Sequence, residues 1–474
     1  MSRNTKNCLL SVLLTFALML FLAACGQTEP EPAAPTEEPA AEEAAPPEEP
    51  AAAETEEAME EEPAAAETEE AMEEEPAAAE EEAMEASEPS GDPIRIGSSL
   101  SLTGPFAPTA AIHKIVGDIY VEKLNAEGGL LGRPVEWVVF DDESTPDNAA
   151  AIYERLITEE EVDLLIGPYG SGNIAAAMNV AERYGYVFPH HTGSLTYAYT
   201  YDKHFPMWYT GLHPNITTSN LLFDALETSE NPPKTIGFVV NQFPGSKFMA
   251  YGEEGSDEGG AEKIAEERGY EVVLDVDFPL TINDWGPIAA QVRDADPDFI
   301  YLGGLGLNAN GLLEALQAID YKPRGMFILW PAPGPLVALG DTAEDVLSVT
   351  LFEEHAPFLS NPGADEMIEK FHAAATEAGL GYPVVETQAS VSWVAWQVLT
   401  TAVKEADSLD QDVIADWLHN NTVETVIGPV SFDANNQNYG PDLQKIKQIQ
   451  NGEWLVVYPA EFAKEGASLE YPAN

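Results

Sequence analysis

The chain has 474 residues, with 82 acidic and 21 basic side chains and a formal net charge of -61. A field of this sign repels phosphate backbones and anionic lipid head groups, which excludes nucleic-acid binding and a polybasic membrane surface. Residues 26–93 hold 26 of the acidic residues and no Lys or Arg. Residues 94–474 still carry a net charge of -37. This part is longer than one hydrophobic core usually supports, so we expect two domains in it.

Residues 1–24 are typical of a secretory signal peptide. Arg3 and Lys6 precede an apolar run at 9–24, which is shorter than the roughly 20 residues that a membrane-spanning helix needs. The following Leu-Ala-Ala-Cys at 22–25 resembles the lipobox of bacterial lipoproteins, which implies that Cys25 becomes the lipidated first residue. A plain signal peptide with a chance cysteine is the alternative. Cleavage before Cys25 would also remove Cys8, so the exported chain would have no disulfide and no thiol nucleophile elsewhere.

Residues 25–93 are predicted to form a disordered acidic tether. The 13 residues at 51–63 (AAAETEEAMEEEP) repeat unchanged at 64–76, and a shortened copy begins at Ala77. The repeat cannot bury a core, because Ala and one Met are its only apolar residues. Proline and like-charge repulsion favour an extended chain that spans roughly 45 Å or more.

From residue 94 onward, short β-rich runs alternate with amphipathic stretches, which is typical of parallel sheets covered on both faces. The first series has predicted strands at 94–100, 135–140, 162–166 and 186–188 and helices at 111–125, 148–158 and 173–184. After a break near 210–218, the second has strands at 235–241, 272–278, 298–302 and 326–329 and helices at 246–268, 287–294 and 311–319. The C-terminal third has predicted helices at 365–378, 387–406 and 411–420 and strands at 429–432, 445–450 and 454–457. We therefore predict two doubly wound, Rossmann-like α/β domains.

Ligands of open parallel sheets bind beyond the carboxyl ends of the strands. Two glycine-containing turns follow neighbouring predicted strands, PYGSGN at 168–173 and PHHTGS at 189–194. Free backbone N–H groups and the hydroxyls of Ser171 and Thr192 would favour an anionic or carbonyl oxygen there. Helix N-capping is the alternative role for each hydroxyl.

Several motifs resemble the type I periplasmic binding proteins of ABC transporters, in particular the branched-chain amino acid and amide receptors (leucine-binding protein-like). They are IRIG at 94–97, LTGP at 102–105, LNAEGGLLG at 124–132 and FDD at 140–142, and the likeness continues with DFIY at 298–301 and TVIGPVSFD at 425–433. The resemblance implies two lobes joined by three hinge crossings, near 210–218, 349–357 and 432–436. Lobe one would comprise 94–213 and 355–432, and lobe two 214–354 and 433–474.

The resemblance also implies a site between the lobes. Ser171 and Thr192 match the hydroxyl residues that hold the substrate carboxylate, and His190 stands where a backbone group usually contributes. The residues that hold the ammonium in the family are a tyrosine and an acid of lobe two. Here Leu305 stands near the tyrosine position, and Trp330 begins a WPAPG segment without an acid.

A buried ammonium without a carboxylate partner costs several kcal/mol. A zwitterionic amino acid would therefore need another counter-charge, for which Glu353 and Glu354 are candidates; otherwise the ligand lacks the amine. We expect Gly170, Leu305 and four aromatic residues to line the cleft, and Trp208 is a further candidate. Core packing is the alternative role for each aromatic residue. The four are Phe106, Tyr169, Phe243 and Trp330.

Catalysis is the weaker interpretation. The pairs Asp141-Asp142 and His190-His191 could suggest acid–base or metal chemistry, but adjacent side chains diverge, and neither HExxH, GxSxG nor a Walker loop is present. We expect no metal, no cofactor and no catalytic residue.

The function predicted from the sequence is an exported solute-binding lipoprotein, anchored through Cys25 to the outer face of a bacterial membrane. It would capture a small carboxylate- or amide-bearing solute, such as a branched-chain or aromatic amino acid, and present it as a monomer to an ABC permease and its ATPase. A ligand-sensing receptor for a signalling partner is the alternative, as is a binder of aromatic acids, short amides or urea.

Overall fold

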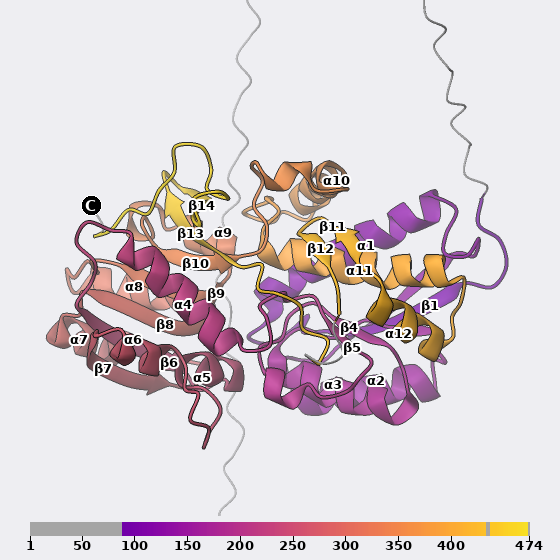
Figure 1. The fold of residues 1–474 in the computed structure, drawn as a ribbon, viewed down its shortest axis with the longest axis horizontal. Coiled ribbons are helices and arrows are strands. Elements are labelled where there is room, and N and C mark those ends of the chain that lie inside the picture. Colours follow the sequence, from indigo (N-terminus) through magenta and orange to yellow (C-terminus); the bar gives the residue numbers. More distant parts are fainter. Residues whose placement is uncertain (1–87, 433–436, 473–474) are drawn as a thin grey trace, which may run out of the picture. The chain divides into compact units, whose positions relative to one another are not determined.

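In the computed structural model, the alternating strands and helices form two main β-sheets with helices packed on their faces (Figure 1). The structure describes residues 88–432 and 437–472. The predicted signal peptide, Cys25, most of the predicted tether and nearly all of the third predicted crossing lie outside these ranges. Among the helices in these ranges, none combines the length and the apolar character that spanning a membrane requires.

The strands of the described residues are β1 (Ile94–Leu100), β2 (Val135–Asp141), β3 (Leu164–Leu165), β4 (Phe188–His190), β5 (His204–Pro206), β6 (Thr235–Asn241), β7 (Glu271–Phe278), β8 (Phe299–Gly306), β9 (Met326–Pro331), β10 (Leu347–Thr350), β11 (Val423–Thr425), β12 (Gly428–Val430), β13 (Lys445–Gln450) and β14 (Glu453–Tyr458). The α-helices are α1 (Ala107–Ala126), α2 (Pro146–Thr158), α3 (Ser171–Tyr184), α4 (Pro214–Glu227), α5 (Pro244–Tyr251), α6 (Ala261–Glu267), α7 (Gly286–Ala295), α8 (Asn308–Ala318), α9 (Pro333–Val337), α10 (Ala364–Glu377), α11 (Thr387–Ala406) and α12 (Gln411–Asn420).

The N-terminal sheet has the strand order β2-β1-β3, and all its strands are parallel. Strands β4 and β5 form a separate parallel pair. A hydrogen bond of 2.8 Å from the Gly167 N–H to the Pro189 carbonyl joins the chain after β3 to β4. Helix α1 packs against α10 and α11, and α2 packs against α3, on the other side of the strands in Figure 1. The carboxyl ends of β1, β3 and β4 consequently face the same way.

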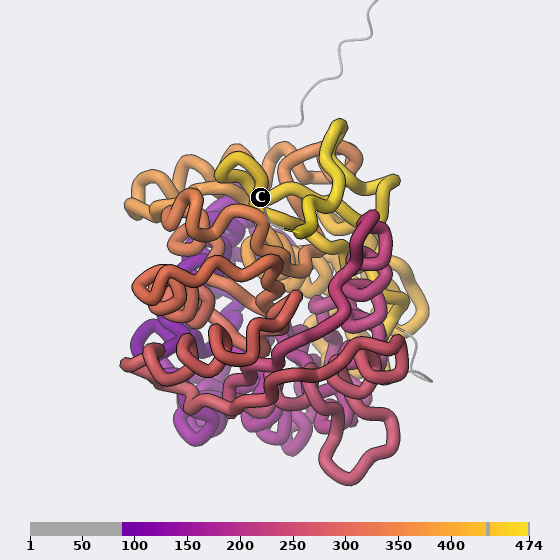
Figure 2. The backbone as a smooth tube through the Cα atoms, turned by 90° about the vertical axis from the view of Figure 1, so that its left-hand side faces the viewer, coloured from indigo at the N-terminus to yellow at the C-terminus, as the bar shows by residue number. Residues whose placement is uncertain are grey.

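The second sheet has the strand order β14-β13-β10-β9-β8-β6-β7. Strands β7, β6, β8, β9 and β10 are parallel, whereas β13 is antiparallel to both β10 and β14. The last strands of the chain therefore complete a sheet that residues 235–350 begin. Figure 2 shows these yellow C-terminal strands beside the magenta helix α4, against which β13 packs.

Both faces of the second sheet are buried. In β6, Phe238 and Val240 belong to the core that also contains Ala250 and Ala261 of α5 and α6. Val239, between them, belongs to the opposite core with the residues of α7 and α8. Successive side chains of a strand point to opposite faces, so a continuous apolar run such as that of β6 requires helices on both sides.

The structure differs from the predicted elements in α4, which the sequence did not indicate. Its face toward the core carries polar residues that interrupt the apolar pattern. The buried Thr218 donates to Gln444 Oε1 at 2.6 Å, and the Asn215 side chain donates to the Gly259 carbonyl at 2.5 Å. These bonds satisfy groups that are costly to bury unpaired, and they conceal the helical period from a reading based on apolar residues.

The prediction of one helix over 246–268 is wrong, because α5 ends at Tyr251 and α6 begins at Ala261. Gly252 has a φ of +84°, and a Cβ atom there would lie 2.3 Å from the Gly259 carbonyl oxygen. The chain folds back on itself at this point, so only glycine fits. Strands β5, β10 and β11 were also not predicted; each has three or four residues, too few for a clear period.

Candidate functional site

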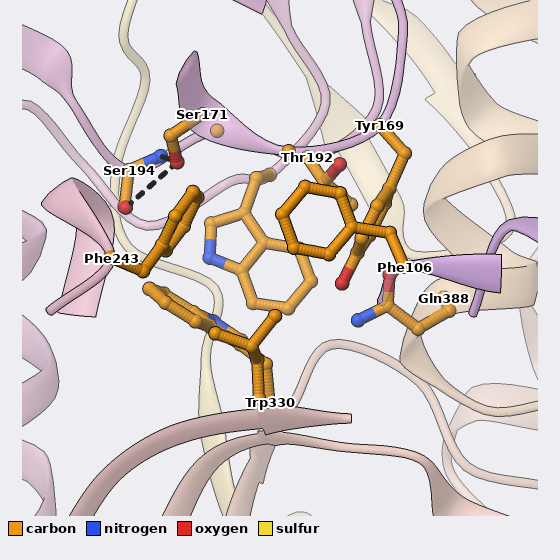
Figure 3. Close-up of a pocket in the computed structure, with 12 residues that line it drawn as sticks. Phe106, Tyr169, Ser171, Thr192, Ser194, Phe243, Trp330 and Gln388 are labelled. Atoms are coloured by element: carbon orange, nitrogen blue, oxygen red, sulfur yellow. Dashed lines mark hydrogen bonds between the residues drawn. The ribbon is translucent and has the colours of Figure 1, made fainter. Parts of the chain in front are cut away.

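A narrow, partly open cavity lies at the carboxyl ends of strands from both sheets (Figure 3). The structure brings together eight predicted site residues around it: Phe106, Tyr169, Gly170, Ser171, Thr192, Phe243, Leu305 and Trp330. The further candidate Trp208 also lines it, together with Gly193, Ser194 and Gln388, which the sequence analysis did not name. Phe243, Leu305 and Trp330 come from the second sheet, and the other residues come from segments that pack with the first.

The turn at 169–171 is shaped by close packing. Gly170 has a φ of +93°, and a Cβ atom there would lie 3.2 Å from the ring of Phe106. This left-handed conformation lets the chain turn directly from the end of β3 into α3, which begins at Ser171. Ser171 is therefore the first residue of the helix, two residues before the predicted start at 173.

One end of the cavity carries hydroxyl groups. The Ser171 Oγ lies 3.1 Å from the Ser194 Oγ and accepts a hydrogen bond of 3.1 Å from the Ser194 N–H. Gly245, near the start of α5, is so close that a Cβ atom on it would lie 2.8 Å from the Ser194 Oγ and 3.1 Å from the Ser171 Oγ. The N-terminal ends of α3 and α5 thus meet beside these hydroxyls. Free N–H groups and aligned peptide dipoles at such ends favour an anionic or carbonyl oxygen.

The walls of the cavity are aromatic. The ring of Phe106 makes edge-to-face contacts with Tyr169 and Phe243, with centroid distances of 5.6 and 5.7 Å. Phe106, Tyr169 and Leu305 form a small buried cluster, against which Phe243 and Trp330 pack. The lining contains no Asp, Glu, Lys, Arg or His side chain. The cavity can therefore enclose an apolar body, but it offers no ionised partner for a charged group.

The structure does not bring His190 to the cavity. Its ring packs against Tyr199 and His204, with centroid distances of 5.3 and 5.7 Å, and burial lowers its pKa well below the ordinary value. The neighbouring His191 is closer to the site, because its Nδ1 lies 3.3 Å from the Thr192 Oγ1.

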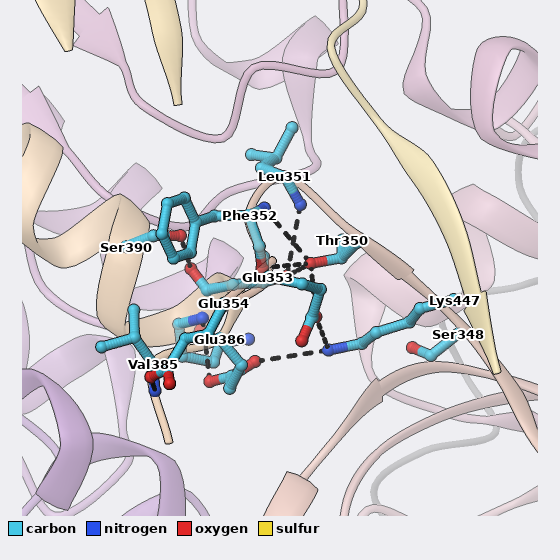
Figure 4. Close-up of polar contacts among 12 residues, drawn as sticks. Ser348, Thr350, Leu351, Phe352, Glu353, Glu354, Val385, Glu386, Ser390 and Lys447 are labelled. Carbon is cyan, nitrogen blue, oxygen red and sulfur yellow. Dashed lines mark hydrogen bonds and ion pairs between the residues drawn. The ribbon is translucent and has the colours of Figure 1, made fainter. Parts of the chain in front are cut away.

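Glu353 and Glu354, the candidate counter-charges, also lie outside the lining (Figure 4). Glu354 accepts a hydrogen bond of 2.7 Å from His372 Nε2. Glu353 forms an ion pair of 2.7 Å with Lys447, whose Nζ is also 3.8 Å from Glu386. We call Glu353, Glu386 and Lys447 the buried charge cluster; their side chains are at most 5% exposed. Glu353 and Glu354 are thus each paired with a residue outside the cavity lining.

Gln388 is the lining residue that sequence reasoning missed. It is the second residue of α11, and the rule of strand ends directed attention to loops rather than to the interior of a predicted helix. The first turn of α11 also contains Thr387 and Ser390, so no signal in the sequence set Gln388 apart. Ser194 and Gly193 lie just beyond Thr192 in the same turn, so the predicted turn already contained them.

The other polar pair considered for catalysis, Asp141-Asp142, is hydrogen-bonded to β1 and to the loop that follows β1. Asp142 is buried and accepts hydrogen bonds from the hydroxyls of Ser99 and Ser101 at 2.8 and 2.6 Å, and Asp141 accepts one of 2.8 Å from Thr103. Within residues 88–432 and 437–472, no group of three or more His, Cys, Asp or Glu side chains is placed to hold a metal ion.

Comparison with known proteins agrees with this geometry. The family model described as periplasmic binding protein matches residues 93–444. The leucine-, isoleucine-, valine-, threonine- and alanine-binding protein of Pseudomonas aeruginosa is 22% identical over 351 residues, which are 72% of this chain and 86% of that protein.

Two solved structures are similar in fold. The branched-chain amino acid transporter substrate-binding protein of Streptococcus pneumoniae, in complex with isoleucine, has a TM-score of 0.60 at 18% identity and covers 79% of this chain and 99% of its own. An ABC-transporter solute-binding protein of Rhodopseudomonas palustris, in complex with benzoate, has a TM-score of 0.64 at 20% identity with the same coverage. The chain thus belongs to the periplasmic binding protein family and has its type I α/β fold.

Proposed function

We propose that this protein is the solute receptor of an ABC importer and that it encloses a small carboxylate with an apolar or aromatic body, without transforming it chemically. The observation that carries the proposal is the composition of the cavity lining. It has hydroxyls and helix N-termini at one end, aromatic rings along its walls and no ionised side chain. We propose a permease and its ATPase as partners because the chain belongs to this family.

The cavity lining has no Asp or Glu side chain, which favours a ligand that carries a carboxylate but no amine. A buried ammonium that has lost its hydration needs a carboxylate partner. The candidate counter-charges, Glu353 and Glu354, are engaged by Lys447 and His372. The similar structures hold either isoleucine or benzoate. The aromatic walls and the lack of a counter-charge favour the second type of ligand for this chain.

We further propose that the two sheets are the cores of two lobes that close over the solute. Lobe one would comprise 94–213 and 355–432, and lobe two 214–354 and 433–474. Two observations support the division. Strands β13 and β14 complete the second sheet, and α10 and α11 pack against α1 beside the first. The cavity is lined from both groups of elements, as closure requires.

A Gly245→Val variant is expected to bind benzoate about 10- to 100-fold more weakly while keeping its thermal stability. The added side chain would collide with the Ser171 and Ser194 hydroxyls and with the ring of Phe243, at a typical overpacking cost of about 1–3 kcal/mol. If the lobes hinge, the variant relieves the collision by staying open, so the collision opposes closure rather than folding. Calorimetric titration and thermal unfolding of the purified protein measure the two effects.

The matched control is Gly381→Val, because a Cβ atom at Gly381 would meet nothing within 4 Å. It should leave both benzoate affinity and stability near the wild-type values. Undiminished binding by Gly245→Val would contradict closure at this contact. A large loss of stability in Gly245→Val would show that the two groups of elements cannot separate.

The lipid anchor is a separate part of the proposal and rests on the Leu-Ala-Ala-Cys motif at 22–25. Lipidated Cys25 would hold the protein on the outer face of a bacterial membrane, with residues 26–93 as the tether. Metabolic labelling with a radioactive fatty acid tests this assignment: the full-length chain should incorporate label, and an unlabelled mature protein would rule the anchor out.

A further inference from the structure

A second polar group faces the cavity from α11, away from the hydroxyl end. Figure 3 shows Ser171 and Ser194 on one side of the cavity and the Gln388 side chain on the other, directed into it. Gln388 is 3% exposed, and its Oε1 accepts no hydrogen bond from any residue that the structure describes. A buried amide oxygen without a donor costs about 1–3 kcal/mol, so the placement of this side chain requires an explanation.

Two stacked histidines connect Gln388 to Thr192 at the back of the cavity. The rings of His113 and His191 are stacked with a centroid distance of 4.0 Å and an interplanar angle of 17°. His191 Nδ1 lies 3.3 Å from the Thr192 Oγ1. His113 is 1% exposed and contacts the Tyr169 ring at 5.2 Å. The pair therefore backs three residues of the cavity wall.

The two histidines behind the cavity wall carry no charge. Burial lowers the pKa of His113 to about 3, and the nearby Gln388 side chain raises it by a smaller amount. Burial also lowers the pKa of His191 well below its ordinary value. Both rings are consequently neutral at neutral pH. Both His113 nitrogens and the Gln388 Oε1 lack a hydrogen-bond partner among the described residues, and Figure 3 shows the Gln388 amide nitrogen on the cavity side. In this orientation the amide Nε2 is the group that can donate into the cavity.

We propose that Gln388 is a specificity-determining residue that donates a hydrogen bond to a second oxygen of the ligand, at the end opposite the carboxylate. The inference rests on the proposed function and narrows it. The preferred solute is an aromatic acid that bears a hydroxyl or carbonyl oxygen on its body.

The energetic reason is the cost of leaving the amide unsatisfied. An unsubstituted acid would fill the cavity, exclude water and bury the Gln388 Nε2 without an acceptor. A site built to hydrogen-bond a substrate oxygen discriminates strongly against the analogue that lacks it. Such discrimination differs from that of the aromatic walls, which select only for shape and apolar area.

The test compares benzoate with 2-, 3- and 4-hydroxybenzoate by calorimetric titration of the full-length protein at pH 7.5. At least one hydroxybenzoate is expected to bind about 10-fold more tightly than benzoate. Gln388→Met, which keeps the volume and removes the donor, should abolish this advantage.

The decisive quantity is the ratio of hydroxybenzoate affinity to benzoate affinity within each protein, because a general loss of structure lowers both affinities alike. Benzoate binding without any hydroxybenzoate advantage would overturn this inference and leave the proposed function standing, as would an advantage that survives Gln388→Met. No binding of any of the four acids would instead overturn the proposed function, and this inference with it.

Discussion

A Lys447→Met variant is expected to lose about 3–5 kcal/mol of unfolding free energy at pH 8. Lys447 is the sole cation of the buried charge cluster, and its Nζ lies 2.7 Å from Glu353 and 3.8 Å from Glu386 (Figure 4). Methionine would fill a similar volume but would leave two buried carboxyl groups without compensation. Removing one partner of such an ion pair is far more costly than the pair is stabilising.

The loss should depend on pH, because one cation faces two acids. Burial raises the pKa of Glu386 to about 7, against the opposing effect of Lys447, and burial likewise raises the pKa of Glu353. A carboxyl group whose pKa is raised in the folded state binds a proton on folding, so its contribution to stability falls as pH rises from about 4.5 through 7. Without Lys447 both pKa values rise further. The difference between variant and wild type should therefore be smaller at pH 5 than at pH 8.

Chemical denaturation at both pH values measures this effect. Lys464→Met is the matched control, because Lys464 pairs with Glu453 at 3.1 Å on the surface and both side chains are more than 40% exposed. An exposed pair contributes about 0–1 kcal/mol, so this variant should unfold nearly as the wild type does. A Lys447→Met variant that is no less stable than Lys464→Met would contradict the description of the cluster as a buried ion pair.

The second large effect concerns the hydroxyls of Ser171 and Thr192, to which the ligand's carboxylate is assigned. A Ser171→Ala/Thr192→Ala double variant is expected to bind benzoate at least about 100-fold more weakly, because each hydrogen bond to a charged group contributes about 1.5–3 kcal/mol. Both residues line the cavity, and Ser171 begins the helix whose N-terminus faces it. Calorimetric titration of the purified variant measures the loss.

The control replaces Thr158 and Ser360 with alanine, since both are exposed and lie outside the lining. This variant should bind as the wild type does, and thermal unfolding should show that both double variants are folded. Retained benzoate affinity in Ser171→Ala/Thr192→Ala would remove the carboxylate from the assigned end of the cavity.

Much of the fold could be predicted from the sequence where the periodicity is strong. The strands at 235–241 and 445–450 and the helices at 387–406 and 411–420 have the predicted bounds. The prediction missed α4, where the buried Asn215 and Thr218 are satisfied by partners distant in sequence. It also joined α5 to α6, because the need for glycine at 252 depends on a contact with Gly259. Tertiary partners decided both cases.

The candidate site could likewise be predicted only in part from the sequence. The rule of strand ends selected Ser171 and Thr192, because the carboxyl ends of parallel strands meet at one edge of a sheet. It could not select Gln388, which reaches the cavity only because α11 packs against α1. Nor could it separate His190 from His191, whose side chains differ in direction along one short segment.

The central claim is that the cavity encloses an acid without an amine, and two ligands with one carbon skeleton test it most directly. Calorimetric titration of the purified protein should show that 3-phenylpropionate binds more tightly than phenylalanine, because only the latter brings an ammonium into a lining without a carboxylate. Tighter binding of phenylalanine would contradict the claim, since it would require a counter-charge that the lining does not contain.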